Sequence, residues 1–192
     1  MAKKYEFKPD KPRSGLLSKL YLTQMQRRSL LKWLLYALVL VALSVIQDVL
    51  LCRMRIFGAT TELVPCGIFL ICLTEGLENG CVLSLAASCL YLFSGTAAGF
   101  YSIALITCLA VLVTYFRQSL LQKTFATVML CTAVAMILYE LGVFAFGLIL
   151  SQTLPNRVVG FLLTAIMTLV TAPVLYPIIQ SIRKVGGEAW KE

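Results

Sequence analysis

The stretch 62–95, ELVPCGIFLICLTEGLENGCVLSLAASCLYLFSG, decides how this chain folds. It is almost wholly apolar, but as one helix it would be about 50 Å long, whereas the hydrocarbon core of a membrane is about 30 Å thick. The polar segment 75–80, EGLENG, interrupts it near the middle. We therefore expect two short helices joined by a polar turn.

The composition of the whole chain points to a membrane. Apolar residues make up 59% of the 192 residues, charged residues only 14%, and the mean hydropathy is +0.87. A soluble domain has about a quarter of its residues charged, so the surplus apolar surface of this chain must face lipid. The other apolar runs are 33–52, 98–116, 125–150 and 158–182. With the two helices of 62–95, they predict an all-α integral membrane protein with six transmembrane helices.

The distribution of Lys and Arg supports six spans over five. Lys and Arg concentrate on the cytoplasmic side of membrane proteins. With six spans and a cytoplasmic N-terminus, only Arg53, Arg55 and Arg157 of the 17 basic residues lie outside. If 62–94 crossed once, seven of them would lie outside. We therefore expect a basic cytoplasmic tail at 1–32, a membrane domain at 33–184 and a second cytoplasmic tail at 185–192.

Several functions are excluded by what the sequence lacks. It has no histidine, and its seven cysteines form no CxxC pair, which argues against a histidine-based active site and against a metal site. No motif for a nucleotide or another cofactor is present. We expect no catalytic, cofactor-binding or metal-binding residue, and no enzyme activity.

The net charge of +8 is crowded into the N-terminal region, beside the first span. An anionic lipid surface at the cytoplasmic face is therefore the expected partner of these residues, rather than nucleic acid. From Ser14 onward apolar residues recur at roughly helical spacing, with Lys19, Arg27 and Arg28 between them. This segment is either a short helix at the membrane surface or a disordered basic tail, and the pattern leaves both open.

Glu140 lies near the middle of the run 125–150, where a lone carboxylate would cost several kcal/mol. It must be protonated, paired or turned toward protein. Because we expect no second acid at that depth, a packing or hydrogen-bonding role is favoured over proton or cation transport.

Two sets of small residues recur every four positions. Gly80, Ser84 and Ser88 share one helix face, and so do Thr164, Thr168 and Ala172. Small residues let membrane helices approach closely. These faces are expected to pack within the bundle, or alternatively against another protein. Leu83, next to Ser84, is expected to face lipid.

Beyond these patterns, the order of several short motifs resembles that of the rod shape-determining protein MreD family. The motifs are QD at 47–48, TELVP at 61–65, TEGLENG at 74–80, GTAAG at 95–99, YE at 139–140 and PVLY at 173–176. The resemblance covers about residues 33–184.

The resemblance implies a compact bundle of six helices, similar to the S-component fold of energy-coupling-factor transporters. It implies a non-catalytic subunit of the bacterial cell-elongation machinery, located in the cytoplasmic membrane and supporting side-wall peptidoglycan synthesis and rod shape. Its direct partner would be MreC, which has a single membrane helix. MreB, RodA and a penicillin-binding transpeptidase would be indirect partners.

The shared fold also leaves an alternative function, that of an S-component which binds a vitamin. S-components typically carry an Ala-x-x-x-Ala motif on the first helix. In this chain Ala37 and Ala42 are five apart, which does not place them on one such face.

Overall fold

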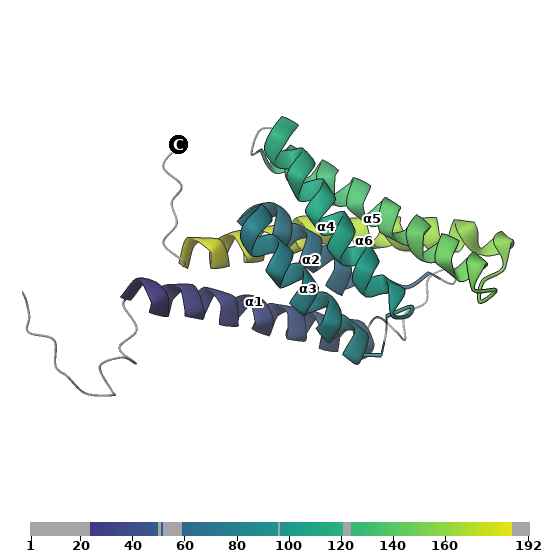
Figure 1. The fold of residues 1–192 in the computed structure, drawn as a ribbon, viewed down its shortest axis with the longest axis horizontal. Coiled ribbons are helices and arrows are strands. Elements are labelled where there is room, and N and C mark those ends of the chain that lie inside the picture. Colours follow the sequence, from purple (N-terminus) through teal and green to yellow (C-terminus); the bar gives the residue numbers. More distant parts are fainter. Residues whose placement is uncertain (1–23, 50, 52–58, 96, 121–123, 186–192) are drawn as a thin grey trace, which may run out of the picture.

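The computed structural model describes residues 24–49, 51, 59–95, 97–120 and 124–185 (Figure 1). Its elements are α1 (Gln24–Val49), α2 (Leu63–Glu75), α3 (Leu77–Phe93), α4 (Tyr101–Leu120), α5 (Phe125–Ile149), the short 3-10 turn η3 (Pro155–Arg157) and α6 (Val158–Val185). No β-strand occurs in these ranges, so the predicted all-α class is confirmed.

Successive helices run in opposite directions, so the start of α1 and the end of α6 lie at the same end of the bundle (Figure 1). We name this the terminal end; it also holds the α2–α3 turn. The opposite end, where α3 leads to α4 and α5 to α6, is the loop end. Four segments are long and apolar enough to cross a membrane, namely Ser29–Val49, Tyr101–Ser119, Phe125–Ile149 and Pro155–Lys184, whereas α2 and α3 are shorter apolar helices.

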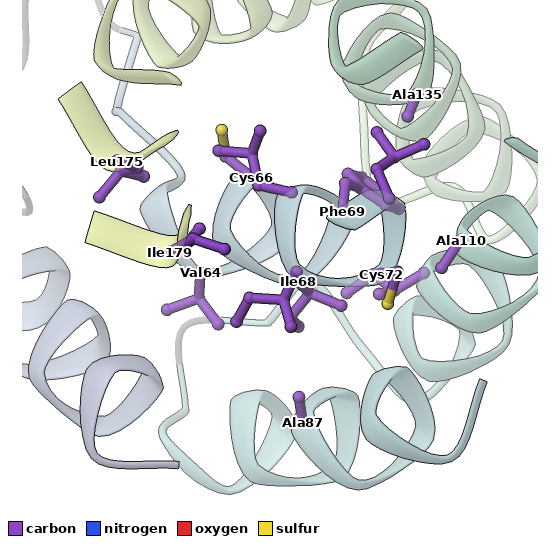
Figure 2. Close-up of a cluster of buried hydrophobic side chains, with 14 of the residues drawn as sticks. Val64, Cys66, Ile68, Phe69, Cys72, Ala87, Ala110, Ala135, Leu175 and Ile179 are labelled. Carbon is purple, nitrogen blue, oxygen red and sulfur yellow. The ribbon is translucent and has the colours of Figure 1, made fainter. Parts of the chain in front are cut away.

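Helix α2 forms the core of the bundle. Every residue from Leu63 to Thr74 is buried. Figure 2 places α2 at the centre, with Ala87 of α3, Ala110 of α4, Ala135 of α5 and Ile179 of α6 around it. With 13 residues α2 is about 20 Å long, less than the thickness of a bilayer core. It is therefore surrounded by protein along its length.

The break between α2 and α3 lies at Gly76. Its φ is +97°, in the region where a side chain is strained and glycine is not. The Gly76 N–H donates to the carbonyl of Cys72, and the Gly76 carbonyl accepts from the Gly80 N–H, so this residue ends one helix and starts the next. The predicted pair of short helices in 62–95 is thus confirmed.

The first helix differs from the predicted run 33–52, because α1 begins at Gln24 and continues through Arg27 and Lys32. The first turns of α1 can hold these two charged residues for different reasons. Lys32 is buried but forms an ion pair with Glu75, and Arg27 is exposed. The possible surface helix around Ser14 lies outside the described residues. Of the other runs, α4 begins at Tyr101 rather than 98, and α6 begins at Val158 as predicted.

Candidate functional site

A polar cluster, buried except for the half-buried Glu62, surrounds the N-terminus of α2, toward the loop end. Glu62 immediately precedes α2, and its N–H donates to Thr168 Oγ1 of α6 at 3.0 Å. The hydroxyl of Tyr91, on α3, donates to Glu62 Oε2 at 3.3 Å. The N–H of Val64 donates to Gln47 Oε1, on α1, at 3.0 Å. These bonds satisfy two backbone N–H groups near the start of α2 and hold it against three other helices.

Helix α5 brings two more polar side chains into this cluster. Glu140 and Tyr139 are each 1% exposed. Glu140 Oε1 is buried and makes no hydrogen bond to the described residues, whereas the Tyr139 hydroxyl lies beside Glu62 and Tyr91. Glu62 is close enough to act electrostatically on both Tyr139 and Glu140. We name Gln47, Glu62, Tyr91, Tyr139 and Glu140 the acidic cluster.

The acidic cluster corrects one expectation from the sequence. Glu140 was expected to have no second acid near it, but Glu62 is its neighbour. The cause is the short length of α2: its first residues lie inside the bundle instead of at a membrane surface. Neither carboxyl group forms an ion pair with a described residue. Two carboxyl groups, two phenols and an amide, among apolar side chains, can bind and exchange protons and accept hydrogen bonds.

The first predicted small-residue face lies inside the bundle. Gly80, Ser84 and Ser88 are all buried. A Cβ at Gly80 would lie 3.1 Å from the Cα of Cys72, and the Cys72 thiol donates to the Gly80 carbonyl at 3.2 Å. Ser88 Oγ lies 3.4 Å from Thr107 Oγ1 of α4. This face of α3 therefore packs on α2 and α4.

The second face, Thr164, Thr168 and Ala172 of α6, is also buried, and Thr168 connects it to the acidic cluster. Both threonine hydroxyls donate to the carbonyl four residues earlier, Thr164 to Gly160 and Thr168 to Thr164. The hydroxyls are thereby satisfied inside the bundle.

The orientation of α3 differs from one detail expected from the sequence. Leu83 was expected to face lipid, but it is 5% exposed and belongs to the core. Its neighbours Val82 and Leu85 are the exposed residues. The sequence could not decide this, since leucine and valine suit lipid and protein contact equally.

A second polar group, which the sequence analysis missed, lies at the terminal end. Lys32 of α1 forms an ion pair with Glu75 at the end of α2, and the Tyr36 hydroxyl donates to Glu75 Oε1 at 2.5 Å. The side chains of Lys32 and Glu75 are 9% and 6% exposed. One signal existed, because Lys32 and Tyr36 are four apart and share a helix face. Their partner, however, is 39 residues beyond Tyr36.

Of the residues predicted at the membrane surface, only Arg27 has a described side chain, and it is exposed at the terminal end. Lys19 and the side chain of Arg28 lie outside the described residues. No group of three or more His, Cys, Asp or Glu residues that could hold a metal ion occurs in the described ranges.

An apolar groove opens between α1 and α3, beside Tyr91. Its volume is about 160 Å³. The lining residues are Leu40, Val41, Ser44, Val45, Val64, Ala87, Leu90, Tyr91 and Ser94. Ala87 and Val64 in its floor are buried, whereas Val41, Val45 and Leu90 at its rim are more than half exposed. Large rim residues and a small residue at the floor form a surface that can receive side chains of another helix.

No protein-family model, curated protein or solved structure matches this chain.

Proposed function

We propose that the chain is a six-span protein of the bacterial cytoplasmic membrane with both termini in the cytoplasm. The alternating directions of the helices support this topology, because they put both ends of the described chain at one end of the bundle (Figure 1). The distribution of basic residues supports the cytoplasmic side for that end.

Within that membrane, we propose that it acts as a non-catalytic subunit of the cell-elongation machinery, as the resemblance to the MreD family implies. Its direct partner is MreC, and through MreC it supports the work of MreB, RodA and a penicillin-binding transpeptidase on the side wall. The groove between α1 and α3 is the observation that carries this proposal. It lies on faces of two helices that the rest of the described chain leaves exposed, where the single membrane helix of MreC can pack.

The size and lining of the groove favour a helix over a small molecule. Pockets for small molecules usually have volumes of about 300–1,000 Å³ and several polar groups. This groove is smaller and almost entirely apolar. Membrane helices associate through close packing next to small residues, and Ser44 and Ala87 supply such residues here.

The test compares two matched substitutions. Val45→Trp fills the groove, and Val170→Trp places the same bulk on an exposed face of α6 away from it; the two valines are 55% and 68% exposed. We expect Val45→Trp to abolish co-purification of MreC and Val170→Trp to preserve it, with equal melting temperatures in detergent. Failure of the unsubstituted protein to capture MreC rejects the function. Equal capture by both variants rejects the groove as the binding site.

The second candidate function, that of a vitamin-binding S-component, is favoured by the acidic cluster. The buried Glu140 carboxyl oxygen, which makes no hydrogen bond to the described residues, is a polar group that a bound molecule would satisfy. Mass spectrometry of the protein purified in detergent separates the two functions. A vitamin that co-purifies in stoichiometric amount, and is lost in Tyr139→Phe, establishes the S-component.

A further inference from the structure

The last turns of α4 carry two buried polar side chains without partners. Arg117 is 6% exposed and Thr114 is fully buried. Arg117 Nε and Thr114 Oγ1 are both buried and make no hydrogen bond to the described residues. They are three residues apart, so they lie on the same face of the helix. A buried donor without an acceptor destabilises the fold by about 1–3 kcal/mol, and by more when it is charged. We therefore expect a hydrogen-bonding group from outside the described residues to lie against this face.

One of the groups that act on Arg117 is a second cation. Arg183, on the last turn of α6, acts on Arg117 as a like charge. The other groups that act on it are Cys131 of α5 and Tyr176 of α6, a thiol and a phenol that are not anions at neutral pH. Neither arginine forms an ion pair with a described residue.

The two described acidic residues of the α2–α3 turn, Glu75 and Glu78, do not supply the missing counter-charge. Glu75 is already paired with Lys32 and accepts from Tyr36. Glu78 is exposed on the first turn of α3 and forms no ion pair with a described residue. The helix dipole of α2 puts about half a negative charge at its C-terminus. This partial charge also acts on Lys32, so it is not available to the two arginines alone. Among the described residues, the two guanidinium groups therefore have no full counter-charge.

We propose that Arg117, Arg183 and Thr114 form a binding site for a phosphate group. Phosphate oxygens accept two parallel hydrogen bonds from a guanidinium group, and Arg binds them better than Lys because its donors form a planar fork. The Thr114 hydroxyl can donate to a third oxygen. The bound group is either the phosphate of an anionic lipid or free inorganic phosphate.

The position of the site suits a lipid headgroup. Arg117 lies three residues before the end of α4 and Arg183 two residues before the end of α6. Clefts between helices with basic residues on the cytoplasmic side bind such headgroups. This proposal is more specific than a general attraction of basic residues to anionic lipid, because binding at the site depends on one buried guanidinium group. It is independent of the function proposed above and holds for a scaffold or a transporter subunit.

The test uses the full chain, purified in a non-ionic detergent and titrated with three probes. The probes are dioleoylphosphatidylglycerol, inorganic phosphate, and dioleoylglycerol, which has the same acyl chains without phosphate. Occupancy is measured by native mass spectrometry and binding by the rise in melting temperature. The matched variants are Arg117→Gln and Lys184→Gln, because Lys184 is an exposed cation at the same end of the bundle.

We expect saturable binding of a phosphate-containing probe, weakened at least about tenfold by Arg117→Gln and less than about twofold by Lys184→Gln. Arg117→Lys should bind with intermediate affinity because it keeps the charge and loses the fork. If the phospholipid binds and inorganic phosphate does not, the site is a lipid site. If inorganic phosphate binds, the ligand is a soluble phosphate.

Three results overturn the proposal: neither phosphate probe binds, dioleoylglycerol binds as well as the phospholipid, or the two Gln variants lose affinity equally. If Arg117→Gln does not fold, the affinity of Arg183→Gln is compared with that of Lys184→Gln instead. Arg183 is only partly buried at a helix end, so its replacement is compatible with folding.

Discussion

Tyr36 and Glu75 join the first two helices at the terminal end through a hydrogen bond of 2.5 Å from the phenol to the carboxylate. The same carboxylate pairs with Lys32, so three side chains hold the end of the buried helix α2 against α1. Because α2 ends at Glu75, this group and the acidic cluster near Glu62 attach the core helix at both of its ends.

Glu75→Gln is expected to destabilise the protein, because it removes the carboxylate that forms an ion pair with the buried Lys32 ammonium. Breaking a buried ion pair from one side costs about 3–5 kcal/mol. The melting temperature in detergent should fall clearly, and the double variant Lys32→Met with Glu75→Gln should recover part of the loss. Glu78→Gln, on the exposed neighbouring acid, is the control and should change nothing. Equal melting of Glu75→Gln and Glu78→Gln is the result that contradicts this role.

Glu140→Gln is expected to keep the fold and most of the function. The substitution preserves size and hydrogen-bonding capacity, and it removes a charge that would be unpaired in an apolar interior beside Glu62. Stability should change by less than about 1 kcal/mol. Melting temperature and capture of MreC measure the two properties. Loss of function at normal protein level and normal insertion would instead assign Glu140 a role in proton exchange.

Ser84→Leu is expected to destabilise the bundle. Ser84 is fully buried on the face of α3 that packs on α2 and α4, and an overpacked position costs about 1–3 kcal/mol. Val82→Leu is the matched control, because Val82 is 66% exposed on the same helix. A lower melting temperature for Ser84→Leu alone indicates internal packing. An unchanged melting temperature with lost capture of MreC would place a partner on this face.

Arg157→Cys tests the topology. Residue 157 is exposed in η3 at the loop end, which lies outside the cytoplasm in the topology that we propose. In a background in which the native cysteines are replaced, this thiol should react with a membrane-impermeant maleimide on intact cells. Reaction only after lysis would reject the six-span arrangement with cytoplasmic termini.

Local sequence determined the helical class and most helix positions. Apolar runs of sufficient length form helices in a membrane because the backbone has no water to bond, and Gly76 breaks the run 62–95 because its φ of +97° suits glycine. The recurring small residues also identified faces that the structure buries. These features depend on composition and on neighbours within a few residues, which a single sequence displays.

Only the tertiary structure decided which apolar surfaces are buried in the bundle and which are exposed on it. A surface exposed on the bundle and a core surface are both apolar, so α2 carries no polar stripe to mark its orientation. On α3 the small residues mark one face, but the side chains of Leu83 and Val82 do not show which of the two is buried. The same holds for the polar contacts. Glu62 lies near Glu140, and Lys32 forms an ion pair with Glu75, because α2 is short and central. That placement comes from the packing of five other helices around α2.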